Sequence, residues 1–241
     1  MNDAVTQYLK QQHELGFRTL FLADEAAAPV PAGPAAASAP VSADTSGGKA
    51  AALKALYDAN QSCAKCALSK TRDKFVFGSG NANARLLFIG EAPGADEDRQ
   101  GLPFVGKAGQ LLTKMIENGM GIPRSDVYIA NILKCRPPGN RDPLPGEREA
   151  CTPVLVEQIR ILKPEFICCL GRISGRFLLG LDETFTLKSM RQRFYDFMGA
   201  KVCVTYHPSA LLQHAEWKKD AWEDLKFLIK AMGLAIPAQF K

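Results

Sequence analysis

Residues 85–112 read RLLFIGEAPGADEDRQGLPFVGKAGQLL, and this stretch decides the fold class. An apolar run ends at Gly90, a loop rich in Gly, Pro and acidic residues follows, and the pattern becomes helical after Gly106. A loop between a buried strand and a helix often binds phosphate through backbone N–H groups, so carboxylates at this place are unexpected. The stretch therefore predicts a strand–loop–helix unit with a different chemistry. Its acidic residues are Glu91, Asp96, Glu97 and Asp98.

The same alternation continues along the chain. Further apolar runs follow at 127–133, 165–171 and 201–208, and helical patterns occupy 106–118, 147–162, 172–180 and about 216–232. Continuous apolar runs indicate strands that are buried on both faces. We therefore expect an α/β fold of three layers (α/β/α), with helices on both sides of a central, mostly parallel four-stranded sheet.

Distinctive polar residues follow three of these strands. The acidic loop comes after the first run, Asn131 lies near the end of the second, and HPSALL (207–212) follows the last. Ligands bind at the carboxyl ends of parallel strands, because the loops converge there. We expect these three segments to share one cleft.

The composition divides the chain into three parts. Residues 1–24 have the pattern of an amphipathic helix, residues 25–52 are dominated by Ala, Pro, Ser and Gly, and residues 53–241 hold the strand and helix patterns above. The middle part lacks the apolar bulk for a core, so we expect a disordered linker that tethers an N-terminal extension to one globular domain.

The overall composition sets broad limits on function. The 241 residues are 46% hydrophobic and carry a net charge of +5, which allows a polyanionic partner without demonstrating one. We see no secretory signal and no apolar run long enough to span a membrane. We therefore expect a cytoplasmic protein without membrane contact.

Seven cysteines fall into two groups. Cys63 and Cys66 form a Cys-x-x-Cys pair, whereas Cys135 and Cys151 flank a Pro-rich loop. Two ligands on one turn and two from distant loops can close a thiolate site around zinc or an iron–sulfur cluster, and spacing does not choose between them. The remaining three lie inside apolar runs, so we expect them in the core: Cys168, Cys169 and Cys203.

Three motifs together resemble one protein family. GEAPGADEDRQGLPFVGKAGQLL, NILKCRPPGNRDPLPGEREAC and HPSALL are similar to the family 4 uracil-DNA glycosylases, the iron–sulfur branch of the uracil-DNA glycosylase superfamily. The resemblance runs from about Ala52 to near the C-terminus. It implies removal of uracil from DNA as a monofunctional glycosylase in base excision repair, and a [4Fe-4S] cluster held by Cys63, Cys66, Cys135 and Cys151.

The resemblance assigns roles in uracil recognition. An enzyme that acts on a base must take it out of the stack and read its edge in a pocket. Phe104 is the stacking candidate, and the Asn131 amide offers the acceptor and donor that match uracil N3–H and O4. His207, helped by a backbone N–H at the Glu91–Ala92 turn, would stabilise negative charge on the leaving uracil, and a neutral imidazole would suffice as the donor.

Other residues would act on water and DNA. By resemblance, Glu97 is the first candidate for positioning the attacking water, followed by Glu91 and then Asp96. For phosphate contacts we expect the helix start at Lys107, and Ser209. Leu211 and Leu212 could form a wedge that enters the base stack. Where many family members carry a basic residue just beyond the wedge, this chain has Gln213 and His214.

Three alternatives compete with this interpretation. A related branch becomes covalently attached to its product through a His in an inserted loop, but CRPPGNRDPLPGEREAC contains neither. A non-catalytic DNA-binding or polymerase-associated module would keep a structural cluster. An electron-transfer protein would need neither the acidic loop nor HPSALL. We expect a monomer whose partners are uracil-containing DNA and, through the N-terminal extension, a replication or repair protein.

Overall fold

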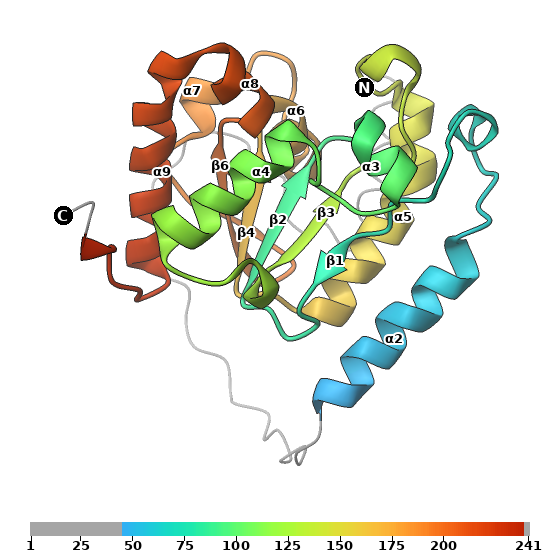
Figure 1. Ribbon diagram of the computed structural model, residues 1–241, viewed down its shortest axis with the longest axis horizontal. Coiled ribbons are helices and arrows are strands. Elements are labelled where there is room, and N and C mark those ends of the chain that lie inside the picture. Colours follow the sequence, from blue (N-terminus) through green and yellow to red (C-terminus); the bar gives the residue numbers. More distant parts are fainter. Residues whose placement is uncertain (1–44, 239–241) are drawn as a thin grey trace, which may run out of the picture.

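The apolar runs of the sequence form the strands of one sheet, shown in Figure 1 for residues 45–238, which the computed structural model describes. Four strands are parallel neighbours, in the order β3 (Tyr128–Asn131), β2 (Leu86–Gly90), β4 (Phe166–Leu170) and β6 (Ala200–Thr205). Each lies at one of the predicted runs. The prediction of a mostly parallel α/β sheet is confirmed.

The sheet has six strands, so the predicted number of four is wrong. The additional strands are β1 (Ser79–Gly80), antiparallel to β3, and β5 (Tyr195–Phe197), antiparallel to β6. Both are short edge strands of two or three residues, and only Phe197 among them is buried. They have no apolar run, because an edge strand is not covered on both faces.

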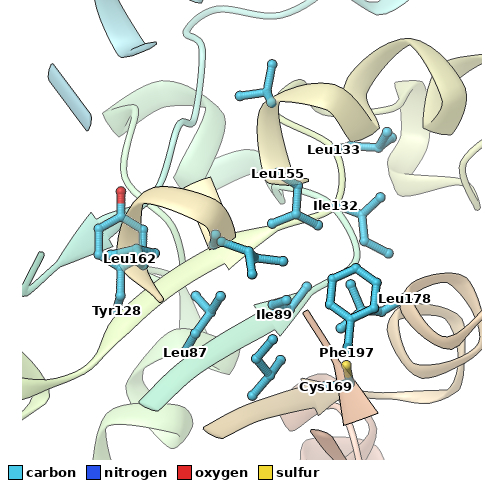
Figure 2. Close-up of a cluster of buried hydrophobic side chains, with 14 of the residues drawn as sticks. Leu87, Ile89, Tyr128, Ile132, Leu133, Leu155, Leu162, Cys169, Leu178 and Phe197 are labelled. Carbon is cyan, nitrogen blue, oxygen red and sulfur yellow. The ribbon is translucent and has the colours of Figure 1, made fainter. Parts of the chain in front are cut away.

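Side chains alternate between the two faces of each strand, and helices bury both faces. Leu87 and Ile89 of β2 point into one apolar cluster, whereas Leu86 and Phe88 point into the other. Figure 2 shows part of the first cluster, which α5 and α6 cover with residues such as Leu155 and Leu178. Full burial of one such side chain stabilises the fold by roughly 1.5–3 kcal/mol.

The longer helices lie at or near the predicted segments. On the first face lie α5 (Pro145–Leu162) and α6 (Arg172–Leu179), and on the second lie α4 (Lys107–Lys114) and α9 (Lys218–Ala231). A π-helix, Met115–Met120, continues α4. The short α-helices are α3 (Ala95–Gln100), α7 (Leu187–Met190) and α8 (Pro208–Gln213), and the 3₁₀ turns are Ala67–Lys70, Arg124–Asp126, Pro138–Asn140 and Ala215–Trp217.

Helix α2 (Thr45–Asn60) begins inside the stretch that we predicted as linker. Leu53 is buried in the first cluster, and Lys49 Nζ donates a hydrogen bond to the Leu162 carbonyl of α5 at 2.8 Å. Alanine is the best helix former, so the alanines that suggested a linker also favour a helix once one face is packed. The predicted boundary at residue 52 is therefore wrong; residues 1–24 and 25–44 lie outside the described residues.

Between Thr45 and residue 238, none of the helices has the length and hydropathy needed to cross a membrane.

Candidate active site

A cleft of about 540 Å³ opens at the carboxyl ends of β2, β3 and β6. The acidic loop, the end of β3 and the start of α8 line it together, as the topology predicted. Seven predicted residues line this cleft: Glu91, Ala92, Glu97, Phe104, Asn131, His207 and Ser209. A larger hollow of about 670 Å³ lies between α5 and α6, but none of the predicted site residues lines it. The smaller cleft is therefore the candidate active site.

Asn131 presents an unsatisfied acceptor at the bottom of this cleft. It is the last residue of β3 and is 1% exposed, and its Oδ1 has no hydrogen-bond partner within residues 45–238. A buried polar atom without a partner costs about 1–3 kcal/mol. An acceptor left unpaired in a cleft fits a ligand that brings its own N–H.

Gly90, the register partner of Asn131, leaves room beside this amide. A Cβ at residue 90 would lie 2.3 Å from Asn131 Oδ1 and 2.6 Å from Phe104 Cζ, so any other residue would displace one of them. The Asn131 amide and the Phe104 ring therefore approach each other over the bare end of β2. This arrangement can offer a flat ring a stacking face and an edge contact.

Phe104 is held in an unusual backbone conformation. Its φ is +53°, in the left-handed region that few bulky residues adopt. The ring is buried, and its centroid lies 5.6 Å from that of His207. Because such a conformation persists only where the surroundings impose it, the loop around Phe104 must be fixed by specific contacts.

Glu97 supplies some of these contacts. Its Oε1 accepts hydrogen bonds from the backbone N–H groups of Val105 and Gly106, both at 2.8 Å. One carboxylate oxygen of our first candidate for water positioning thus anchors the Phe104 loop. Sequence spacing does not reveal this role, because Glu97 and Val105 meet only when the loop folds back.

The carboxyl group of Glu91 is half-buried at the wall of the cleft. Burial raises its pKa from 4.5 to about 7, Asp142 raises it further, and Arg148 and Arg172 oppose the rise. A carboxyl group that titrates near neutral pH at the wall of a cleft can serve as a proton acceptor. Glu91 and Glu97 both line the cleft, but one oxygen of Glu97 is engaged by the backbone of the Phe104 loop.

His207 is neutral in this setting. Burial lowers its pKa from 6.5 to about 4, although Glu97 acts in the opposite direction. Its Nδ1 accepts from the Ser209 backbone N–H at 3.2 Å and lies 2.7 Å from Ser209 Oγ. An Nδ1 that accepts leaves the proton on Nε2, so a neutral imidazole can donate a hydrogen bond from that nitrogen.

The structure does not bring the other predicted residues into the cleft lining. Asp96 pairs with Arg99, and Lys107 is exposed at the start of α4. Asp98, one of the four acidic residues, is buried and accepts from the Asp73 backbone N–H at 3.0 Å.

Leu211 does not fit the predicted wedge. It is 2% exposed, whereas Leu212 is 49% exposed. The two leucines are neighbours on α8, where a shift of one residue turns a side chain from the interior toward solvent. A buried Leu211 would have to leave the core to enter a base stack, so of the pair Leu212 is the wedge candidate.

Two arginines near the cleft carried no motif in the sequence. Arg172 begins α6 and lines the cleft, and Arg124 contacts the loop of Phe104. Arginine is common on protein surfaces, and neither residue lies at a spacing that singles it out. Only the folded chain shows their position.

Four cysteines are neighbours at one end of the sheet. The pKa of the Cys135 thiol is raised by burial and also by Cys66 and Cys63, and that of Cys151 is raised to about 11 by burial, with Cys135 and Cys66 contributing. These mutual effects require proximity. Cys168, Cys169 and Cys203 are buried in the strands, as predicted.

Hydrogen-bond donors face two of these sulfurs. Arg72 Nη1 donates to Cys135 Sγ at 3.1 Å, and the Lys134 backbone N–H donates to Cys151 Sγ at 3.2 Å. Within the described chain, no three Cys, His, Asp or Glu side chains are arranged to hold a metal ion. Four neighbouring thiols, two of which accept hydrogen bonds at their sulfurs, nevertheless have the chemistry that iron–sulfur clusters use.

Comparison with known proteins agrees with this site. The family model of the uracil DNA glycosylase superfamily matches residues 77–226. The Type-4 uracil-DNA glycosylase of Archaeoglobus fulgidus is 43% identical over 185 residues, which cover 74% of this chain and 92% of that protein. That of Saccharolobus solfataricus is 42% identical over 186 residues, covering 75% and 86%.

A third relative, the Type-4 uracil-DNA glycosylase of Pyrobaculum aerophilum, is 42% identical over 179 residues, which cover 72% of this chain and 91% of that protein. The segment matched by the family model contains all the cleft residues described above. This chain therefore belongs to the uracil DNA glycosylase superfamily.

Proposed function

We propose that this protein is a uracil-DNA glycosylase that flips uracil out of DNA, hydrolyses its N-glycosidic bond, and leaves free uracil and an abasic site. One observation carries the proposal: the buried, unpaired Oδ1 of Asn131 lies close to the Phe104 ring at the carboxyl ends of the strands. The superfamily membership and the Type-4 relatives support the same reaction.

Recognition of uracil rests on Asn131 and Phe104. The flipped base stacks on the Phe104 ring, and its N3–H donates to Asn131 Oδ1. Cytosine has no proton at N3, so it leaves this acceptor unpaired. It also carries an amino group in place of O4, and this donor would face the NH₂ donor of the Asn131 amide. An unpaired buried acceptor disfavours cytosine strongly.

Cleavage develops positive charge on the sugar and negative charge on uracil. The bond between C1′ and N1 breaks, and its electron pair leaves with the base. His207 donates from neutral Nε2–H to uracil O2, and the Ala92 N–H adds a second donor. Water attacks C1′ and gives its proton to the Glu91 carboxylate. We keep Glu97 as the anchor of the Phe104 loop, with Asp96 outside the cleft.

The DNA strand would be held by polar groups around the cleft. Lys107 and the N–H groups of the first turn of α4 can bind one phosphate. The Ser209 hydroxyl, which donates to His207 Nδ1 in this structure, would have to turn away from that ring to bind another. Leu212 is placed to fill the gap that the flipped base leaves. These contacts would fix the position of the strand without reading its sequence.

The cysteines would hold a [4Fe-4S] cluster on Cys63, Cys66, Cys135 and Cys151. When bound, the cluster would supply a rigid link between the Cys-x-x-Cys turn and the Pro-rich loop. We assign it no redox role, because hydrolysis of a glycosidic bond needs no electron transfer. The Arg72 and Lys134 donors would then stabilise the charge of the coordinated sulfurs. Iron analysis of protein purified without oxygen tests this assignment.

We also propose a cytoplasmic monomer whose N-terminal extension contacts a replication or repair protein. The extension lies outside the described residues, so this proposal rests on its amphipathic pattern in the sequence. Light scattering of the full-length chain tests the monomer.

An assay with an end-labelled oligonucleotide that carries one uracil tests the reaction. We expect strand cleavage at the uracil after hot alkali and no slowly migrating adduct in the unheated lane. An adduct would favour the covalent branch. Intact DNA with iron-loaded protein that still binds the strand would favour the non-catalytic binding module.

A further inference from the structure

We infer that Arg124 is a positioning residue for uracil excision, which holds the loop of Phe104 in the conformation that presents its ring to the base. The inference rests on the proposed function and extends it to a residue outside the cleft lining. Arg124 begins the 3₁₀ turn Arg124–Asp126, well after the acidic loop in the sequence.

Arg124 binds the carbonyl groups of the loop. Its Nη2 donates to the Pro103 carbonyl at 3.0 Å and to the Phe104 carbonyl at 2.9 Å. Its Nη1 donates to Thr113 Oγ1 at 2.7 Å and to the Gly109 carbonyl at 3.4 Å. The planar guanidinium therefore joins the loop to α4 in a geometry that the single nitrogen of a lysine cannot reproduce.

Glu97 binds the amides of the same loop. It accepts from Val105 and Gly106, directly after the two carbonyls that Arg124 binds. Burial lowers the pKa of Arg124, whereas Glu97 and Glu117 raise it, so the two clamping charges attract each other. Two opposite charges thus fix the donors and the acceptors of one short segment.

The conformation of Phe104 shows why such a clamp is needed. Its positive φ is unfavourable for a bulky residue, and the chain would relax if its partners were removed. The loop also lies directly on α4: a Cβ on Gly109 would lie 2.0 Å from the Phe104 carbonyl carbon. The Arg124 contacts to Gly109 and Thr113 hold this close approach together.

A displaced Phe104 would affect chemistry and not merely stability. The ring sets the stacking plane of uracil between Asn131 and His207, and a shift of about 1 Å at a reacting centre can cost about a hundredfold in rate. Arg124 would therefore act through Phe104, without touching the substrate.

The test compares Arg124→Met and Arg124→Lys with a control, Arg176→Met, in the full-length protein. Arg176 also clamps backbone carbonyls, those of Phe185 and Glu183, but it does not line the cleft. Uracil release is measured under single-turnover conditions, together with inhibition by free uracil and the thermal midpoint. We expect Arg124→Met to lose about a hundredfold in rate and Arg176→Met less than about threefold.

The same substitution in a Phe104→Leu background separates positioning from general damage. If Arg124 acts through Phe104, Arg124→Met should cost less than about threefold there, because effects on one pathway are not additive. An equal loss in both backgrounds, or an Arg124→Met rate within about threefold of wild type, would overturn the inference. If Arg124→Met is insoluble, Arg124→Lys decides by the same criterion.

The controls also separate this inference from the proposed function. A wild-type protein that releases no uracil would contradict the proposed function itself. A wild type that excises uracil, beside an Arg124→Met variant that excises it equally well, would contradict only the role of Arg124.

Discussion

The candidate active site and the cysteine corner (Cys63, Cys66, Cys135 and Cys151) both depend on the segment that follows β3, but they are built on different principles. In the cleft, Glu97 and Arg124 bind backbone groups of the Phe104 loop, while the Asn131 acceptor has no partner within residues 45–238. In the corner, donors point at the sulfurs of Cys135 and Cys151, two of the four residues proposed to hold the cluster. We therefore expect the cleft to recognise the base and the corner to hold distant segments of the chain together.

Lys134 connects these two regions. Its side chain is fully buried, and its Nζ donates to the Asn131 carbonyl at 2.8 Å and to Gln158 Oε1 at 2.6 Å. Its backbone N–H meanwhile donates to Cys151. Lys134 thus couples the two regions. Because the cleft would contact the base and the corner joins distant segments of the chain, we expect changes in the cleft to alter rate first and changes in the corner to alter stability first.

The largest effect on rate is expected from Asn131→Leu. The variant keeps the shape of the side chain but removes the acceptor for uracil N3–H, so uracil release should slow by about a thousandfold or more. The free energy of unfolding should be unchanged or higher, because an unpaired buried acceptor is gone. Single-turnover kinetics and urea unfolding measure the two quantities.

Asn81→Ala is the control for this variant. Asn81 accepts from the Asn83 backbone N–H in an exposed turn away from the cleft, so its loss should leave the rate within about twofold of wild type. An Asn131→Leu rate within tenfold of wild type would contradict the assignment of Asn131.

The opposite pattern is expected from Cys135→Ser. Loss of one ligand should remove the brown colour and the iron, and lower the free energy of unfolding by roughly 4 kcal/mol or more. The control is Cys203→Ala, which replaces a cysteine of the core. This variant should keep the iron that the other four cysteines bind. If Cys135→Ser retained full iron and stability, the comparison between corner and cleft would fail.

Glu91→Gln sharpens the account of the cleft through pH. Because the Glu91 pKa is about 7, its carboxylate form is lost as pH falls, and the wild-type rate should drop about tenfold per pH unit below 7. Glu91→Gln should be about a hundredfold slower at pH 8 and independent of pH. A falling limb that persists in Glu91→Gln would assign the proton transfer to another group.

The Glu91→Gln variant should be slower than wild type but more stable at high pH. A carboxyl pKa raised by folding means that the folded state binds more protons between pH 4.5 and about 7, so stability is lost as pH rises through that window. Glu91→Gln should therefore be more stable than wild type at pH 8, by about 2 kcal/mol, which is less than full linkage because the carboxylate is partly solvated. Thermal unfolding at pH 4.5 and pH 8 checks the sign.

His207 has the reverse dependence. Its pKa is lowered to about 4 by folding, so its contribution to stability is complete above 6.5 and is lost as pH falls toward 4. The imidazole stays neutral across the range in which Glu91 titrates. Replacing His207 by Gln, which keeps a donor, should lower the plateau of the rate without moving the limb near pH 7.

The smallest effect on rate is expected at the exposed leucine of α8. Leu212→Ala should leave the free energy of unfolding within about 0.5 kcal/mol and slow excision from duplex DNA several-fold. Leu211→Ala should instead destabilise the fold by about 2–4 kcal/mol. Denaturant unfolding and the rate of excision from duplex DNA, measured for both variants, would show whether Leu212 is the wedge and Leu211 belongs to the core.

The sequence predicted the parts of the fold that depend on continuous apolar runs. Each strand that is buried on both faces was recognisable, because no polar residue interrupts its core. β1 and β5 were missed, since two or three edge residues leave no periodic signal. The start of α2 was missed because an alanine-rich stretch fits a linker and a packed helix equally well until its partner is known.

The sequence predicted which residues form the candidate site better than it predicted the contacts between them. Motif position located Asn131, Phe104 and His207, but the anchoring role of Glu97 depends on a loop that folds back onto it. Leu211 and Leu212 differ by one residue in a helix whose orientation the sequence does not give. Arg124 binds backbone carbonyl groups. Every residue has such a group, so the sequence does not reveal which residues Arg124 contacts.

Counting the free uracil released per protein molecule, from an excess of an oligonucleotide with a single uracil, tests the central claim most directly. We predict several uracil molecules per protein molecule and an abasic strand that carries no protein. Release that stops at one uracil with a protein–DNA adduct, or no release from iron-loaded protein that binds the DNA, would contradict the account.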